Sequence, residues 1–257
     1  MAYIDKFSLN GKVALITGTS TGLGQGITLA YVQAGAKVVG VDYMATQEDT
    51  VNKVKALGGE FTPVQRDLIK ATPEDLKELV KLVVETYGKL DIVVNNAGII
   101  LREDLVNFSQ DYWDRVMAIN LDTVFFLSQA AANQFIKQGE GGKIINIASM
   151  LSFQGGIRVP SYTASKSAVK GITMAFANEL AKHNINVNAI APGYMATNNT
   201  QALREDETRA GQILERIPAG RWGTPDDVAG PAVFLASEAG SYINGFTLAV
   251  DGGWLAR

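Results

Sequence analysis

Near its N-terminus the chain reads Lys12-Val13-Ala14-Leu15-Ile16-Thr17-Gly18-Thr19-Ser20-Thr21-Gly22-Leu23-Gly24, an apolar run followed at once by a glycine-rich turn. The run 12–17 predicts a buried strand, and a helix is expected to begin at Gly22 and to stop at Gly35. Glycines in such a turn permit unusual backbone angles and let a pyrophosphate approach the main chain. The spacing is G-x-x-x-G-x-G rather than the commoner G-x-G-x-x-G. A plain structural turn is the alternative, but the strand–turn–helix context favours dinucleotide binding.

Short β-branched runs alternate with longer helical patterns along the rest of the chain. Strands that are apolar throughout have both faces covered, and their alternation with helices indicates right-handed crossovers in a parallel sheet. We therefore expect an α/β fold in which 1–257 form one domain, a Rossmann-type doubly wound sheet of about seven parallel strands flanked by helices. The irregular polar part at about 193–218 could form a substrate lid within it. Strands are expected at 12–17, 37–42, 60–65, 91–95, 143–148, 186–190 and 247–250, and helices at 22–35, 47–57, 109–137 and 162–182, with two more opened by Thr72-Pro73 and Thr224-Pro225.

Composition excludes several classes of function. The net charge of -3 over 257 residues gives no electrostatic case for nucleic acid. The absence of cysteine excludes disulfides and thiolate metal sites, and the single histidine, His183, lies at the end of a predicted helix, so no metal site is expected. The N-terminus does not resemble a signal peptide, and no apolar run approaches the ~20 residues that span a bilayer. We expect a cytoplasmic protein with neither membrane nor nucleic-acid partners.

An acidic residue, Asp42, ends the second predicted strand. A carboxylate at this place can accept hydrogen bonds from both hydroxyls of an adenosine ribose, and it would repel a 2′-phosphate. Tyr43 and Met44 follow it, and neither is a cation that could hold that phosphate. The sequence therefore favours NAD(H) over NADP(H), with a solvated strand-end acid as the alternative.

Six motifs occur along the chain in one order. They are Thr17-Gly18-x-x-x-Gly22-x-Gly24, Asn95-Asn96-Ala97-Gly98, Ser149, Tyr162-x-x-x-Lys166, Pro192-Gly193 and Val250-Asp251-Gly252-Gly253. In this order they resemble the short-chain dehydrogenase/reductase family over essentially the whole chain. The resemblance implies a nicotinamide-linked interconversion of a secondary alcohol and a ketone. The residues expected to contact the cofactor are Gly18, Thr19, Ser20, Gly22, Leu23, Gly24, Asp42, Asp67, Leu68, Asn95, Ala97, Gly98, Tyr162, Lys166, Pro192, Gly193 and Thr197.

Tyr162 and Lys166 are four residues apart at the start of a predicted helix, so their side chains face the same way. At ~4 Å and an effective dielectric constant of ~20, an ammonium attracts a phenolate by ~4 kcal/mol before desolvation, which could lower the phenol pKa by two or more units. Tyr162 would then donate a proton to the developing alkoxide, and Ser149 would hydrogen-bond the substrate oxygen. The family resemblance adds Asn120 as a fourth catalytic residue that holds a water for a proton relay from Lys166. The alternatives are a surface Tyr–Lys pair, a turn serine and a satisfied core amide.

A narrower resemblance concerns 142–162, 191–200 and 218–222. These stretches are similar to family members that act on sugar acids in the breakdown of pectin and other uronate polymers. The resemblance implies NADH-dependent reduction of the 5-keto group of a 3-deoxy-hexodiulosonate. A sugar acid needs a cation and hydroxyl partners. The candidates for substrate contact are Ser149, Tyr162, Arg102, Gln154, Asn198 and Arg158.

Other functions stay open because a fold does not determine a substrate. The same scaffold could serve another polyol, a gluconate-like sugar acid or a ketosteroid. A catalytically inactive NAD-sensing protein is a third possibility, although Ser149, Tyr162 and Lys166 are all present. Family members of this length imply a homotetramer, and the apolar segment 247–254 could pack against a neighbouring subunit.

Overall fold

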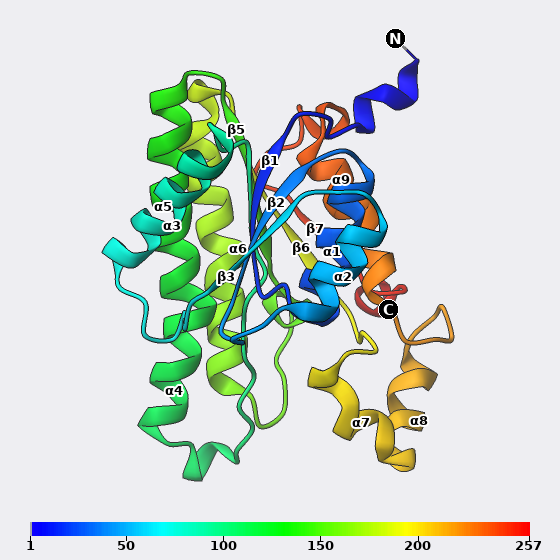
Figure 1. Ribbon diagram of the computed structural model, residues 1–257. Helices are drawn as coiled ribbons and strands as arrows, with labels where there is room; N and C mark the ends of the chain where they lie inside the picture. The colour runs from blue at the N-terminus through cyan, green and yellow to red at the C-terminus, as the bar shows by residue number, and fades with distance from the viewer. Residues whose placement is uncertain (1) are drawn as a thin grey trace.

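The structure, a computed structural model that describes residues 2–257, contains one sheet of seven parallel strands (Figure 1). The order across the sheet is β3-β2-β1-β4-β5-β6-β7, so the chain reverses its direction of growth between β1 and β4. Ligands of open parallel sheets bind at the carboxyl ends of the strands beside such a reversal. The predicted doubly wound fold is confirmed. The strands are β1 (Val13–Thr17), β2 (Lys37–Asp42), β3 (Phe61–Gln65), β4 (Ile92–Asn95), β5 (Gly142–Ile147), β6 (Ile185–Pro192) and β7 (Thr247–Val250).

Helices cover both faces of the sheet (Figure 1). One face carries α1 (Gly22–Gln33), α2 (Glu48–Ala56) and α9 (Pro225–Ala236), and the other carries α3 (Pro73–Tyr87), α5 (Thr123–Gln138) and α6 (Pro160–Leu180). Strands β1 and β6 are buried along their whole length because both of their faces are covered. Alternate residues of one strand therefore enter different cores: Leu15 belongs to the cluster that contains Phe135, and Ile16 to the cluster that contains Tyr31.

Local sequence explains where several helices begin and end. At α3 the Thr72 hydroxyl accepts from the backbone N–H of Asp75, and the Asp75 carboxylate accepts from that of Thr72 in return. Pro73 occupies the first helical position, and Gly88 ends the helix in the left-handed conformation. His183 lies exposed after α6, at the end of a short 3-10 turn, as expected.

The helical region expected at 109–137 contains a π-helical turn. The structure has α4 (Gln110–Met117), then a π-helical turn over Ala118–Asp122, then α5. A π turn accommodates one extra residue per turn and redirects the side chains within it, and such turns are frequent at functional sites. The helical region predicted at 109–137 is therefore present, and the π turn at Asn120 is the feature that the sequence did not predict.

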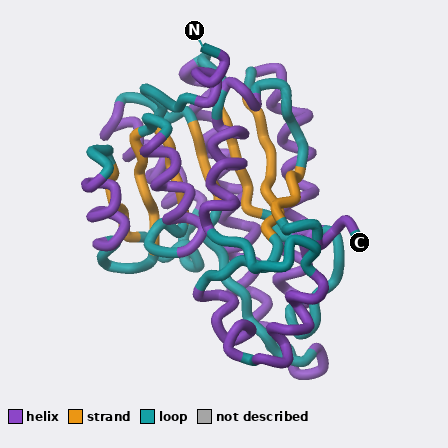
Figure 2. Tube along the Cα trace, turned by 90° about the vertical axis from the view of Figure 1, so that its right-hand side faces the viewer, coloured by secondary structure: helices purple, strands orange, loops and turns teal. Residues whose placement is uncertain are grey.

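The segment between β6 and α9 projects beyond the carboxyl ends of the strands, opposite α4 (Figures 1 and 2). It contains a 3-10 turn (Asn198–Thr200), α7 (Gln201–Glu205) and α8 (Glu207–Arg216). The two ends of this segment are joined by an isolated parallel β-bridge between Met195 and Gly223. Ile213 is the one buried residue in these three elements. None of the helices in residues 2–257 combines the length and apolar character that a membrane crossing requires.

Candidate active site

The glycine-rich turn between β1 and α1 has a backbone that glycine makes possible. Gly18 and Gly22 have positive φ values of 74° and 59°. A side chain on Gly24 would collide with the carbonyl of Gly18. A methyl group on Gly22 would lie 3.6 Å from Thr197, so the turn faces the start of the projecting segment. The glycine-rich turn and the start of the projecting segment, which would form two sides of the predicted cofactor site, thus lie close together.

Asp42 and Ser20 form a polar corner beside this turn. The Asp42 carboxylate accepts from the backbone N–H of Ser20 at 2.9 Å through one oxygen and from that of Met44 at 3.2 Å through the other. The Ser20 hydroxyl is buried and has no hydrogen-bond partner among the described residues. A buried hydroxyl without a partner next to a carboxylate suits the hydroxyls of an adenosine ribose. These residues therefore fit a dinucleotide.

The end of β4 is fastened to its neighbours by side-chain amides. Asn95 donates to Asn146 Oδ1 across the β4–β5 pair at 2.8 Å, as expected of a brace between strands. Asn96 Nδ2 donates to the carbonyl of Thr17 at 2.8 Å, and Thr17 Oγ1 accepts from the N–H groups of Asn96 and Ala97 at 3.0 Å. These contacts join the β4 loop to the glycine-rich turn. The role of Asn96 was missed because a motif does not show which of two adjacent amides points inward.

Tyr162 and Ser149 meet beyond the end of β5. Burial raises the pKa of the Tyr162 phenol, while a hydrogen bond with Ser149 and the positive charge of Arg102 lower it, and burial is the largest of the three effects. The net direction is opposite to the expectation that Lys166 would lower this pKa. The Lys166 Nζ atom lies 5.8 Å from the centre of the Tyr162 ring. At neutral pH the phenol therefore holds its proton, which is the form required of a proton donor.

Lys166 is itself buried, and burial lowers its pKa to about 8. Its ammonium donates to the carbonyl of Ile147 at 2.5 Å. A methyl group on Gly98 would lie 3.7 Å from the ammonium, so this part of the β4 loop adjoins it. Lys166 thus sits between β5 and the β4 loop, where the predicted nicotinamide ribose would bind.

Asn120 lies in the π turn and is fully buried. Its Oδ1 accepts from the N–H of Ile99 at 2.9 Å, and its Nδ2 donates to the carbonyl of Ile99 at 3.0 Å and to Ser165 Oγ at 3.2 Å. The amide therefore fixes the β4 loop against α6. These contacts match the alternative of a satisfied core amide, and a relay role would be additional to them.

The remaining predicted cofactor residues lie at two places. Gly193 follows β6, donates to the carbonyl of Val250, and could not carry a side chain because Asp251 Cα would be 2.7 Å away. Leu68 is buried, and its carbonyl accepts from Thr123, whereas Asp67 is exposed and pairs with Lys70 at 3.6 Å. Pro192 is the last residue of β6.

The two candidate arginines differ in their partners. Arg158 has a positive φ of 63°, and its guanidinium pairs with Asp104 at 2.9 Å and with Glu103 at 3.6 Å. Arg102 is close enough to affect the Tyr162 phenol and donates to the carbonyl of Asn199 at 3.3 Å. Within residues 2–257, Arg102 has no carboxylate within ion-pair distance. The structure therefore favours Arg102 over Arg158 for binding a substrate carboxylate.

Gln154 makes contacts that the sequence did not predict. Its Oε1 accepts from Trp254 Nε1 at 3.2 Å and from Arg216 at 3.5 Å, and the Arg216 guanidinium lies 4.1 Å over the Trp254 ring. Trp254 also packs edge-on against Tyr194 at 4.9 Å. Gln154 thus connects the loop after Ser149 to α8 and to the C-terminal segment. No sequence pattern linked residues so far apart.

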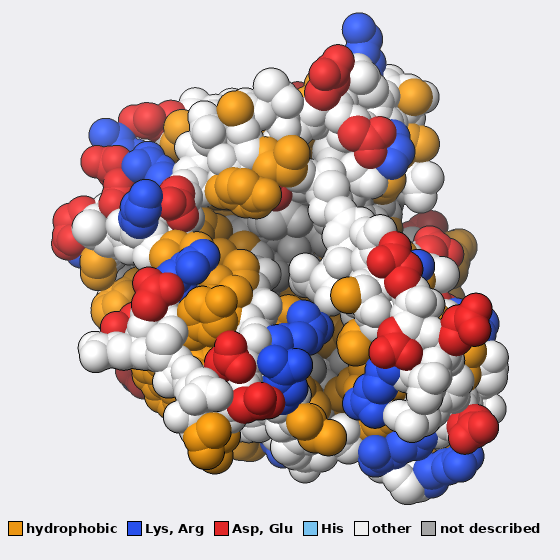
Figure 3. All heavy atoms as spheres, turned by 90° about the horizontal axis from the view of Figure 1, so that it is seen from below, with side chains coloured by type: hydrophobic (Ala, Val, Ile, Leu, Met, Phe, Trp, Pro, Cys, Tyr) orange, Lys and Arg blue, Asp and Glu red, His pale blue; other side chains and the backbone are white. Residues whose placement is uncertain are grey.

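Seen from below, the molecule is hollowed between two lobes, and basic and apolar side chains lie around the hollow (Figure 3). Within residues 2–257, no group of His, Asp and Glu side chains is arranged to hold a metal ion. A proton donor, a hydroxyl partner, an unpaired guanidinium and a dinucleotide turn thus share one end of the sheet. This arrangement can reduce a carbonyl group with hydride from a nicotinamide.

The fold and these residues define a class of protein. A family model described as enoyl-(acyl carrier protein) reductase matches residues 18–255. The chain belongs to the short-chain dehydrogenase/reductase family.

Individual relatives narrow the comparison. The chain is 63% identical over 254 residues to the 2-dehydro-3-deoxy-D-gluconate 5-dehydrogenase of Dickeya dadantii and 61% identical over 254 residues to that of Escherichia coli, covering 99% of both chains in each case. It is also similar to a crystal structure from Agrobacterium tumefaciens with bound NADP, provisionally described as a 2-deoxy-D-gluconate 3-dehydrogenase. That comparison gives a TM-score of 0.92 and 51% identity, and it covers 98% of this chain and 99% of the other.

Proposed function

We propose that this protein reduces the 5-keto group of 3-deoxy-D-glycero-2,5-hexodiulosonate to 2-dehydro-3-deoxy-D-gluconate with NADH, in a reversible reaction. Relatives that carry the corresponding enzyme name match the chain over 99% of their length at 61–63% identity. The reaction would serve the breakdown of uronate polymers such as pectin or glycosaminoglycans.

One observation carries the chemistry: the half-buried Tyr162 lies beside Ser149, and removal from water raises the pKa of its phenol, so the phenol keeps its proton at neutral pH. In the proposed mechanism, Ser149 and Tyr162 hydrogen-bond the carbonyl oxygen of the substrate. A bound nicotinamide supplies the hydride. Tyr162 donates its proton as negative charge develops on the oxygen, and the Arg102 charge stabilises the phenolate that remains. Lys166 would hold the nicotinamide ribose, and Asn120 would hold a relay water.

Arg102 would also bind the carboxylate of the sugar acid. Its guanidinium lies near the phenol and donates to the backbone of the projecting segment at Asn199. A guanidinium without a carboxylate partner is available for a charge-assisted, bidentate contact with substrate. The segment at about 193–218 would act as the lid over this site.

The test is an NADH oxidation assay against a panel of diketo-sugar acids, 5-keto-gluconate and ketosteroids. The expected result is a kcat/KM for the diketo-acid at least tenfold above that for the others. Tyr162→Phe is expected to lower turnover by about 10²- to 10⁴-fold while the protein stays folded and binds NADH. Wild-type turnover in folded Tyr162→Phe would refute the mechanism, and a preference for another ketone would refute the substrate.

A second candidate is the reduction of a gluconate-like keto-acid. The similarity to solved sugar-acid dehydrogenases favours it over a ketosteroid, because Arg102 suits a carboxylate. The same substrate panel separates these activities.

The assembly would be a homotetramer in the cytoplasm. The strand β7 lies at one edge of the sheet, and exposed aromatic side chains of Tyr242 and Phe246 precede it. An open strand edge beside apolar side chains is commonly covered by another chain. Ile136 on α5 and Met174 on α6 add exposed apolar surface that further copies of the chain could cover.

A further inference from the structure

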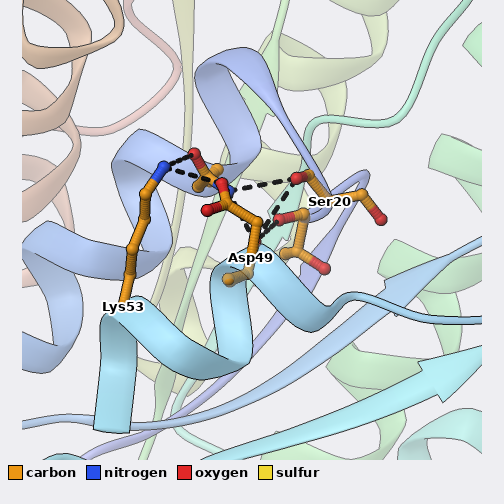
Figure 4. A network of polar contacts seen from close by, with 6 residues as sticks. Ser20, Asp49 and Lys53 are labelled. Atoms are coloured by element: carbon orange, nitrogen blue, oxygen red, sulfur yellow. Dashed lines mark hydrogen bonds and ion pairs between the residues drawn. The ribbon is translucent and has the colours of Figure 1, made fainter. Parts of the chain in front are cut away.

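The glycine-rich turn is tied to α2 through a buried hydroxyl, in the network that Figure 4 shows. Thr50 is fully buried, and its Oγ1 donates to the carbonyl of Thr19 at 2.8 Å and lies 3.4 Å from that of Ser20. Gln25 Nε2 donates to the same hydroxyl at 2.8 Å and to the Ser20 carbonyl at 3.1 Å. Both carbonyls of the turn are therefore held towards α2.

An exposed ion pair orients the Gln25 amide from outside. Lys53 Nζ donates to Gln25 Oε1 at 2.9 Å and to Asp49 Oδ2 at 2.7 Å, and Gln25 Nε2 donates to the same Asp49 oxygen at 2.9 Å. Such exposed pairs contribute little to stability by themselves. Here the pair determines which end of the amide is the donor that faces Thr50.

The orientation of these carbonyls decides where the amide hydrogens of the turn point. In a trans peptide the carbonyl and the N–H of the next residue point in opposite directions. Because the Thr19 and Ser20 carbonyls face α2, the N–H groups of Ser20 and Thr21 face the other side of the turn. The Ser20 N–H meets Asp42 there, and the unpartnered Ser20 hydroxyl lies in the same corner. This is the side where the dinucleotide would bind.

We propose that Thr50 is a positioning residue for the cofactor, whose hydroxyl holds two peptide units of the turn ready for the ADP half of the dinucleotide without touching it. A turn fixed before binding loses less conformational entropy when the ligand arrives. The proposal rests on the proposed function only in requiring a nicotinamide dinucleotide. Binding measured without substrate therefore separates its failure from that of the sugar-acid assignment.

The experiment is a fluorescence titration of NADH and a calorimetric titration of ADP-ribose against Thr50→Val. Valine keeps the shape and removes the hydroxyl. The dissociation constants of both ligands are expected to rise about five- to tenfold, which is the effect of one hydrogen bond on an equilibrium. Thr50→Ser retains the hydroxyl and is expected to restore wild-type binding. Thr62 lies on β3, and its hydroxyl is hydrogen-bonded to that of Tyr87 on α3; Thr62→Val removes it, is the matched control, and is expected to bind like wild type.

Three results would overturn the proposal: unchanged NADH binding in folded Thr50→Val, equal weakening in Thr62→Val, or weakened NADH binding with unchanged ADP-ribose binding. Circular dichroism establishes that each variant is folded. If Thr50→Val does not fold, Gln25→Met removes the other donor to the turn and is expected to weaken both ligands in the same way. Wild-type binding of both ligands by folded Gln25→Met would then refute the proposal.

Discussion

Lys166 shows how a single residue of the site opposes stability. Burial lowers its pKa from 10.5 to about 8, so at neutral pH the folded protein holds an ammonium out of water. Between pH 8 and 10.5 the unfolded chain binds more protons than the folded one, and the stability of the wild type rises with pH over this range. Below pH 8 Lys166 is protonated in the folded protein as well, and the whole cost of burying its ammonium reduces the free energy of unfolding.

We therefore expect Lys166→Met to be inactive yet more stable than wild type at pH 7, by about 2 kcal/mol once the lost contact with Ile147 is deducted. Urea unfolding between pH 7 and 10 would show the difference shrinking as the pH rises. Lys182→Met, at an exposed position after the same helix, is the control and is expected to show no such gain. A constant difference across the pH range would contradict the assignment.

Asp42 is the residue expected to decide between the two nicotinamide cofactors. Its carboxylate at the end of β2 would repel a 2′-phosphate, whereas a similar structure holds NADP. In the wild type we expect NADH to raise the thermal midpoint more than NADPH at equal concentration. In Asp42→Ala we expect this preference to shrink at least tenfold when expressed as the ratio of dissociation constants. A wild type that binds NADPH more tightly would contradict the prediction.

At the residue scale, the sequence predicted which residues form the site better than it predicted their pKa values. Ser149, Tyr162 and Lys166 were found because their types and spacing are specific, and the structure brings all three together. The direction of the Tyr162 pKa was wrong, because the helical spacing shows that a lysine is near and does not show how deeply both groups are buried. Partners from distant segments, such as Trp254 for Gln154, leave no trace in local sequence.

At the scale of elements, the C-terminal segment contacts the last turn of α8. Arg216 lies over the Trp254 ring, and Arg257 donates to the carbonyl of Glu215 at 3.3 Å. The proposed lid has few buried residues, so we expect it to open easily and each such contact to favour its closed form.

Arg216→Gln is expected to raise KM for the substrate about fivefold with little change in NADH binding, since a cation–π contact contributes about 1 kcal/mol. Steady-state kinetics and an NADH titration would measure both quantities. Arg209→Gln, at a partly exposed position on the same helix that does not contact Trp254, is expected to behave as wild type. Equal effects of the two substitutions would show that general loss of charge, and not the contact with Trp254, is responsible.

Elements with strong local signals were predicted well and irregular ones were not. Caps and prolines gave the starts of α3 and α9, because these signals lie within one turn of sequence. The π turn at Ala118–Asp122 was missed because amphipathic periodicity on both sides of it continues with only a small phase change. Within the turn, Asn120 is hydrogen-bonded to Ile99, a residue 21 positions away that no local pattern indicates.

For the whole molecule, the sequence predicted the doubly wound parallel sheet, and the tetramer stays a prediction. Sedimentation is expected to show a tetramer, and Phe246→Asp is expected to shift it towards smaller species, because a charge beside the β7 edge would have to lose its water in an interface. Ile4→Asp changes an even more exposed apolar residue near the N-terminus and serves as the control. An unchanged tetramer in Phe246→Asp would place the interface elsewhere.

The bridge between Met195 and Gly223 has a further consequence for how such proteins diversify. Because entry and exit of the lid lie side by side, the segment between them can be exchanged for one of another length or composition while the sheet, the dinucleotide turn and the proton donor stay in register. Chimaeras joined at these two residues could then acquire new substrates and inherit an intact catalytic scaffold.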